Sequence, residues 1–118
     1  MSLSGDYAII YFMVTFEEFK RLEIKIAQIK SVRDHPNADK LYCLTIDVGG
    51  IEKQIVAGIK LSYQPADLIG KKIVVINNLD PAIIRGEKSE AMLLAASDIR
   101  GISVLIPERD CEIGSIVK

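Results

Sequence analysis

Hydrophobic and polar residues alternate along several stretches of the chain, and a period of two is typical of half-buried β-strands. The first stretch covers residues 22–26, and its alternation changes phase near residues 27–28, which predicts a β-bulge. A second stretch at residues 41–48 is separated by two glycines from a third at residues 51–57, the pattern of a β-hairpin. The remaining predicted strands cover residues 72–77, 92–96, 102–106 and 113–117.

Two short helices are predicted among the strands. Thr15 is suited to cap a helix N-terminus, and Glu18 stands three residues later, where its carboxylate can complete a capping box. Further along, Pro65 marks the start of a helix or turn and Gly70 marks its end. These elements are short, so most of the ordered structure is expected to be strand.

Polar, turn-forming segments separate these elements. Residues 33–40 are predicted to form a loop, residues 77–91 a long polar connection and residues 107–111 a turn. The resulting order is strand, hairpin, short helix and further strands, which matches a five-stranded OB-fold barrel with its helix between the third and fourth strands. We therefore expect an all-β fold: a five-stranded OB-fold barrel with short helices and N- and C-terminal additions.

Composition places the chain among ordinary globular domains. It has 118 residues, of which 49% are hydrophobic and 26% charged, enough apolar residues for the core of one domain. Its longest unbroken apolar run, Tyr7 to Val14, has eight residues, whereas a membrane-spanning helix needs roughly 20. A transmembrane protein is thereby excluded, and no membrane partner is expected.

The net charge of −1 conceals an uneven distribution. Between Lys20 and Lys88 there are twelve basic and eight acidic residues, whereas the two flanks together hold three basic and eight acidic residues. Basic residues neutralise phosphates, so the central region is the part of the chain suited to a nucleic acid. The same uneven distribution of charge is also explained if these basic residues only form the solvent-exposed face of strands.

Candidate catalytic and metal-binding residues are few. Cys43 and Cys111 are far apart in sequence and His35 is the only histidine, so no zinc site of four soft ligands can form within one chain. Ser89 lacks the GxSxG context of a nucleophile, and His35 is expected to stabilise its loop. We expect no enzyme activity, no cofactor, no metal and, without a secretory signal, a cytoplasmic location.

Ordered sequence blocks carry a family resemblance. They read HPNADKLY at residues 35–42, QIVAGI at 54–59 and YQPADLIGKKIVVINNLDPAIIRGEKSEAMLLAAS at 63–97. Together they resemble the tRNA-binding domain family, an OB-fold module found as a stand-alone structure-specific tRNA-binding protein and at the C-terminus of methionyl-tRNA synthetases. The resemblance implies an N-terminal extension at residues 1–14 and an OB-fold tRNA-binding domain with C-terminal dimerisation strands at residues 15–118.

The resemblance also implies a set of tRNA-binding residues. They come from the loop after the first strand and from the segment that enters the last barrel strand, and are Asn37, Lys40, Arg85, Ser89 and Met92. Lysine and arginine neutralise phosphates, asparagine and serine bond sugar hydroxyls or phosphate oxygens, and methionine packs against a base or ribose. Each residue also has a structural explanation without a ligand. Asn37 can form a turn, Lys40 and Arg85 can be solvated surface cations, Ser89 can cap the backbone and Met92 can fill the core.

The chain departs from the family pattern at two positions. Ile83 stands where a basic residue is common, and Ala91 stands where glycine is usual. Alanine disfavours a positive φ, so the backbone around Ala91 is expected to differ and tRNA binding to be weaker than in relatives.

Three functions follow from the resemblance. The first is a non-catalytic homodimer that grips the outer corner of tRNA by shape and works with an aminoacyl-tRNA synthetase. The second is a secretion-chaperone-like protein of the same fold that binds unfolded peptide, and the third is a synthetase fragment. The apolar strands at residues 102–106 and 113–117 need a partner subunit, or must otherwise fold back on the barrel.

Overall fold

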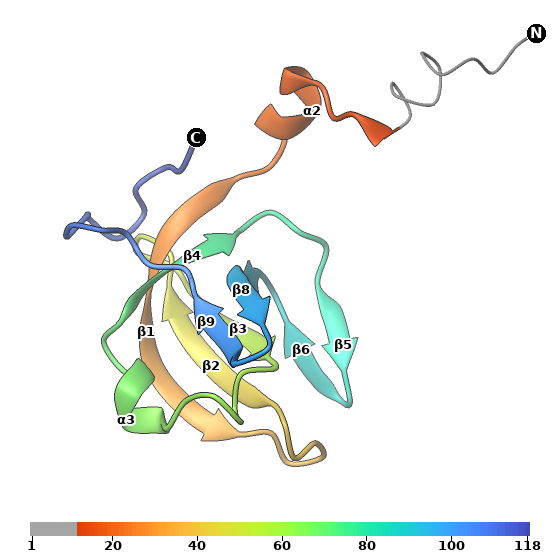
Figure 1. The fold of residues 1–118 in the computed structure, drawn as a ribbon, viewed down its shortest axis with the longest axis vertical. Coiled ribbons are helices and arrows are strands. Elements are labelled where there is room, and N and C mark those ends of the chain that lie inside the picture. Colours follow the sequence, from red (N-terminus) through yellow and green to blue (C-terminus); the bar gives the residue numbers. More distant parts are fainter. Residues whose placement is uncertain (1–11) are drawn as a thin grey trace, which may run out of the picture.

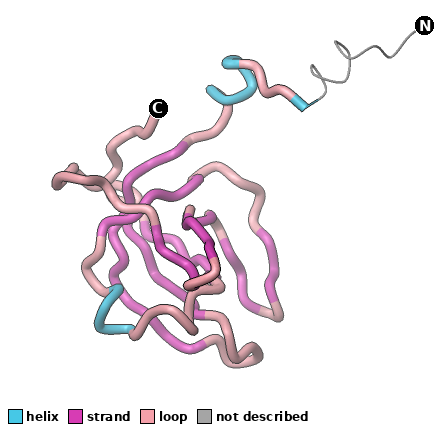
Figure 2. The backbone as a smooth tube through the Cα atoms, viewed as in Figure 1, coloured by secondary structure: helices cyan, strands magenta, loops and turns pink. Residues whose placement is uncertain are grey.

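Five antiparallel strands form a continuous sheet in the order β3-β2-β1-β4-β7 in the computed structural model, which describes residues 12–118 (Figure 1). Their bounds are Ile24–Asp34 for β1, Tyr42–Asp47 for β2, Glu52–Ala57 for β3, Lys72–Ile76 for β4 and Met92–Leu93 for β7. Figure 2 shows these strands curled into a barrel wall, with only short helical segments outside it. The predicted all-β class is confirmed.

Contacts between β3 and the segment before β7 nearly close the barrel. The backbone N–H of Glu90 donates to the Gln54 carbonyl at 2.8 Å, and the Gln54 N–H donates to the Glu90 carboxylate at 3.0 Å. The closed sheet surrounds a core whose largest fully buried side chains are Ile29, Leu44, Ile46, Ile55, Leu68, Ile73, Val75 and Cys43. They come from β1 to β4 and the helix after β3, so the barrel has one hydrophobic centre.

Both predicted helices are present. In α2, Phe16–Lys20, the Thr15 hydroxyl accepts from the Glu18 N–H at 3.1 Å and the Glu18 carboxylate accepts from the Thr15 N–H at 3.0 Å, which completes the capping box. The second helix, α3, Pro65–Leu68, lies between β3 and β4 as predicted.

The predicted bulge in β1 is present but lies beyond residues 27–28. The register of β1 against β2 shifts between Ile29 and Ser31. Gln28 pairs with both Lys72 of β4 and Asp47 of β2, so β1 changes its main partner there and bends just afterwards. Ala27 and Ile29 are both fully buried on the inner side of this bend.

The long polar connection predicted at residues 77–91 contains two strands that were not predicted. This segment contains a hairpin formed by β5, Ala82–Ile84, and β6, Glu87–Ser89, which make a separate two-stranded sheet. Its two-residue turn consists of Arg85 and Gly86, whose φ values of 52° and 89° are those of a type I′ turn. Strands of three residues are too short to show a hydrophobic alternation, so the sequence did not reveal them.

The strand predicted at residues 92–96 is divided. After β7, a separate strand β8, Ala95–Asp98, pairs with β9, Gly101–Val104, in a further two-stranded sheet. The strand predicted at residues 102–106 is therefore present as β9, displaced by one or two residues.

The C-terminal segment folds back on the barrel within the same chain. The Gly114 N–H donates to the Ile26 carbonyl at 2.7 Å, and the Val117 N–H donates to the Ile24 carbonyl at 2.8 Å. Only an isolated bridge between Lys25 and Ile116 is formed in place of the predicted strand at residues 113–117. The segment extends the sheet alongside the first half of β1.

Candidate nucleic-acid interface

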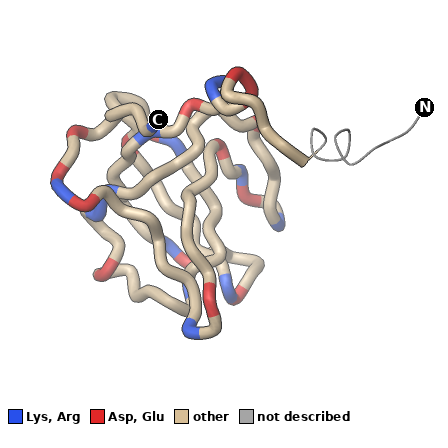
Figure 3. Tube along the Cα trace, turned by 45° about the horizontal axis from the view of Figure 1, so that its top comes forward, with Lys and Arg blue, Asp and Glu red and all other residues tan. Residues whose placement is uncertain are grey.

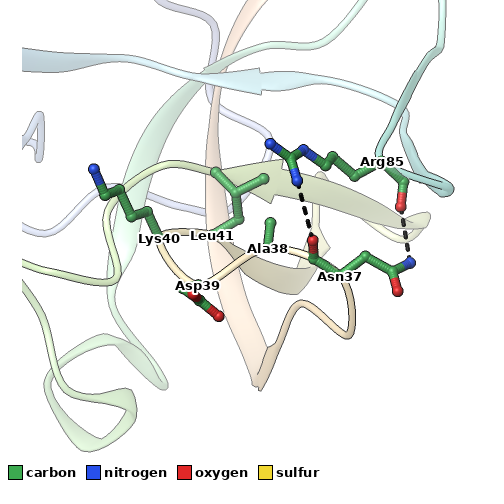
Figure 4. A pocket seen from close by; sticks show the side chains of 6 residues that line it. All are labelled: Asn37, Ala38, Asp39, Lys40, Leu41 and Arg85. Carbon is green, nitrogen blue, oxygen red and sulfur yellow. Dashed lines mark hydrogen bonds between the residues drawn. The ribbon is translucent and has the colours of Figure 1, made fainter.

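The loop between β1 and β2, residues 35–41, touches the turn of the β5–β6 hairpin (Figure 4). The Asn37 side-chain amide donates to the Arg85 carbonyl at 3.0 Å, and the Arg85 guanidinium donates to the Asn37 carbonyl at 3.4 Å. Two segments that lie 48 residues apart in sequence are thereby joined by reciprocal bonds.

His35 adds a third connection, on the buried side of the loop. Its side chain is 5% exposed, Nε2 lies 2.8 Å from the Ile84 carbonyl oxygen, and Nδ1 accepts from the Asn37 N–H at 3.0 Å. The predicted loop-stabilising role of His35 is confirmed. We call the bonds among His35, Asn37, Ile84 and Arg85 the loop–hairpin contact.

A polar network holds β6 against β1 and β3. Arg33 forms an ion pair with Glu87 and also donates to the Gln54 side chain at 3.1 Å, while the Gln54 amide donates to the Lys88 carbonyl at 2.9 Å. The hydrogen bond from Arg33 lowers the pKa of the Glu87 carboxyl below its ordinary value. Cys43 is buried next to this network, and burial raises the pKa of its thiol.

An open pocket of about 410 Å³ lies beside the loop–hairpin contact. Its lining consists of Asn37, Ala38, Asp39, Lys40, Leu41 and Arg85. Lys40 and Arg85 are both basic, and in the view of Figure 4 their charged ends lie apart, with Leu41 between them. The structure thus brings three of the five predicted site residues, Asn37, Lys40 and Arg85, to the lining of one pocket.

Ser89 and Met92 lie elsewhere, beside a second and smaller pocket. Ser89 is 8% exposed, and its hydroxyl accepts from the Val56 N–H at 3.0 Å and donates to the Ala91 carbonyl at 3.1 Å. Met92 is 46% exposed and lines the same pocket of about 230 Å³. The Ser89 hydroxyl therefore joins β6 to β3, whereas the Met92 side chain faces solvent.

The two departures from the family pattern differ in their structural effect. Ala91 is buried, and among residues 12–118 the only non-glycine residue with a positive φ is Arg85. The backbone at residue 91 therefore accommodates alanine without strain. Ile83 is 69% exposed and lies opposite Lys88 across the hairpin.

Charged residues do not gather on one face of the molecule. Figure 3 shows basic and acidic residues interspersed along the chain. Within the described residues, no cluster of three or more His, Cys, Asp or Glu side chains has the arrangement of a metal site. The polar side chains that line the pocket beside the loop–hairpin contact are accordingly two cations, Lys40 and Arg85, one carboxylate, Asp39, and the Asn37 amide.

Residues 24–116 match the model of a family described as "Putative tRNA binding domain". The chain belongs to this tRNA-binding domain family. A methionine–tRNA ligase of Pyrococcus furiosus is 42% identical over 105 residues, which are 89% of this chain and 14% of that enzyme. The chain thus corresponds to a small part of the curated relatives that it matches.

Solved structures of similar size share the fold of this tRNA-binding domain. A MetRS related protein from Pyrococcus horikoshii has a TM-score of 0.83 and 28% identity, covering 90% of this chain and 98% of the other. A CsaA chaperone protein from Picrophilus torridus has a TM-score of 0.84 and 33% identity, covering 90% and 100%. The same fold is thus found in a protein described as MetRS related and in a protein described as a chaperone.

The polar network on β6 was not predicted from the sequence. Gln54 lies in a predicted strand and Glu87 lies in the predicted connection, so neither stood out. The sequence did contain the two charged partners, Arg33 and Glu87, the second of them directly after Arg85 and Gly86. Their pairing could be recognised only once the β5–β6 hairpin was known.

Proposed function

We propose that this domain binds tRNA without catalysing a reaction, as a cytoplasmic module that works with, or forms part of, a methionyl-tRNA synthetase. One observation carries the proposal: the β1–β2 loop meets the hairpin between β4 and β7, and these are the loops with which OB-folds bind oligonucleotides. Two exposed cations line the pocket beside that junction, Lys40 from the β1–β2 loop and Arg85 from the hairpin turn.

Three predicted site residues line the first pocket, Asn37, Lys40 and Arg85, and they have distinct roles in this proposal. Lys40 and Arg85 neutralise phosphates; the guanidinium has five N–H donors and shares one with the Asn37 carbonyl. The Asn37 amide positions the hairpin through the Arg85 carbonyl, and its oxygen has the chemistry to accept from a ribose 2′-OH.

Ser89 and Met92 form the second part of the proposed site. Met92 offers an exposed apolar side chain to a base or ribose, while Ser89 supports the strand end that carries it through bonds to Val56 and Ala91. Ser89 then contributes through backbone geometry.

We further propose that the domain acts as a homodimer. The helix α2 has no buried residue, and Val14, Phe16 and Ile116 are each more than 70% exposed. Figure 1 shows α2 standing away from the barrel near the start of β1. Exposed apolar surface of this kind favours a second subunit as its cover.

The alternative function is binding of unfolded peptide, as in a chaperone. The similarity to the CsaA structure favours it, and so does the second pocket, whose lining includes Val56, Leu79, Ile84 and Met92. Apolar side chains of an extended peptide are the matching ligand for such a lining.

A competition titration distinguishes the two functions. Fluorescent tRNA is bound to the purified protein at two salt concentrations, and duplex DNA or an unfolded polypeptide is added as competitor. We expect saturable, salt-sensitive binding that duplex DNA competes for poorly. Binding of the polypeptide alone would replace the proposal with the chaperone alternative, and light scattering on the same sample reports whether the protein is a dimer.

A further inference from the structure

His35 occupies the most protected position in the loop–hairpin contact. The bonds between Asn37 and Arg85 lie at the exposed surface, where water competes for the same groups. The bond between His35 and the Ile84 carbonyl is shielded, because the His35 side chain is 5% exposed. Of the side-chain bonds between loop and hairpin, this one is the least open to solvent competition.

Both ring nitrogens of His35 are committed to opposite sides of the contact. A backbone carbonyl only accepts and a backbone N–H only donates, so Nε2 must carry the proton toward Ile84 while Nδ1 accepts from Asn37. The two bonds together fit a single tautomer of the ring, with the proton on Nε2. The ring connects the main chain of the β1–β2 loop directly to the main chain of the hairpin.

The hairpin residue that His35 holds immediately precedes Arg85. The other connections of the hairpin to the barrel reach β6, through the Arg33–Glu87 pair and the bond from Gln54 to Lys88. Neither of them includes the turn residues Arg85 and Gly86. The turn is held by the exposed Asn37–Arg85 bonds and by the bond to the Ile84 carbonyl, and only the last of these is shielded from water, so it is the main restraint on the position of Arg85 relative to Lys40.

We infer that His35 is a positioning residue of the tRNA-binding surface, which acts by fixing the hairpin against the β1–β2 loop through its Nε2–H bond to the Ile84 carbonyl. The inference rests on the proposed function. His35 is buried and both of its ring nitrogens are bonded within the protein, so its effect is to set the spacing of the two cations, Lys40 and Arg85.

Two substitutions of His35 by uncharged residues test the two hydrogen bonds of the ring one at a time. Glutamine places an amide nitrogen near the position of Nε2, so His35→Gln retains a donor to the Ile84 carbonyl. Asparagine places an amide oxygen near the position of Nδ1, so His35→Asn retains the acceptor for the Asn37 N–H and loses the bond to the hairpin. Each variant loses one hydrogen bond, and they serve as matched controls for stability.

We expect His35→Asn to weaken tRNA binding about tenfold and His35→Gln to stay within about threefold of the wild type, the size of one lost hydrogen bond. Hydrogen exchange of the β5 and β6 amides should be faster in His35→Asn than in His35→Gln. This second readout needs no tRNA, so it tests the positioning of the hairpin separately from the proposed function.

The outcomes are distinguishable. Equal losses of affinity in the two folded variants, or equal hydrogen exchange in their hairpins, would overturn the inference. If His35→Asn does not fold, His35→Gln decides: near-wild-type affinity supports the inference and a tenfold loss overturns it. A wild-type protein that binds no tRNA contradicts the proposed function, and the exchange comparison then decides whether His35 holds the hairpin.

Discussion

At the scale of single residues, the sequence predicted a set of binding residues, and the structure shows which of them lie together and which are used in internal bonds. Asn37, Lys40 and Arg85 meet at one pocket, as expected for residues that share a surface. Ser89 looked equally suited to a ligand, yet its hydroxyl is enclosed between β3 and β6. Burial depends on the fold of distant segments, so no local pattern distinguishes a hydroxyl that binds a ligand from one that joins two strands.

Arg85 combines a strained backbone with a proposed phosphate contact, and this combination predicts separate effects on stability and binding. At φ 52° a side chain costs about 1–2 kcal/mol, and glycine avoids that cost. Arg85→Gly should therefore leave the free energy of unfolding equal to or above that of the wild type while weakening tRNA binding. Urea denaturation and fluorescence anisotropy measure the two effects; lower stability would show that the turn is unstrained.

Glu87 predicts a contribution to acid sensitivity. Its pKa is lowered in the folded protein by the bond from Arg33, so the stabilisation is complete above the ordinary value of 4.5 and is lost as the pH falls through the folded pKa. Glu87→Gln removes this part of the pH dependence. The difference in unfolding free energy between wild type and variant should shrink on acidification from pH 6 to pH 3, and a constant difference would contradict the assignment.

At the scale of helices and strands, the elements that depend on neighbouring residues were predicted from the sequence, and those that depend on distant residues were not. The capping box of α2 and the Gly49-Gly50 hairpin depend on neighbouring residues, and both were predicted correctly. The β5–β6 hairpin was missed because its stability comes from the loop–hairpin contact and from Gln54, which lie far away in sequence. The sequence therefore predicted which residues of this hairpin belong to the candidate site, but not how the hairpin arranges them in space.

The docking of the C-terminal segment depends on the close approach of two glycines. A Cβ atom on Gly114 would lie 3.2 Å from the Gly49 Cα and 3.4 Å from the Val48 carbonyl oxygen, and φ at Gly114 is 91°. Gly114→Ala should destabilise the protein by about 1–3 kcal/mol, with faster hydrogen exchange at residues 114–117.

Gly50→Ala is the matched control for this substitution. Gly50 has a similar φ of 96°, but a Cβ atom there meets nothing within 4 Å. Its substitution measures the backbone cost alone, and the excess in Gly114→Ala reports the steric contact. Equal losses of unfolding free energy in the two variants would show that the C-terminal segment does not pack closely against the turn.

At the scale of the whole molecule, a nearly closed barrel carries the loop with Lys40 between the end of β1 and the start of β2, next to the hairpin turn with Arg85. No helix within residues 12–118 is long and apolar enough to span a membrane. The interspersed charges in Figure 3 mean that affinity for a polyanion has to come from locally placed cations, not from a strongly positive face. The central claim is therefore that Lys40 and Arg85 neutralise phosphates of a bound tRNA.

The salt dependence of tRNA affinity tests this claim most directly. Lys40→Ala and Arg85→Ala should each weaken binding for all tRNA species and reduce the slope of log K against log salt by roughly one unit for each phosphate that is no longer neutralised. Arg109→Ala is the matched control, because Arg109 is an exposed cation beside a different pocket. The account predicts reduced slopes for the first two variants and an unchanged slope for the third; wild-type slopes in all three would contradict it.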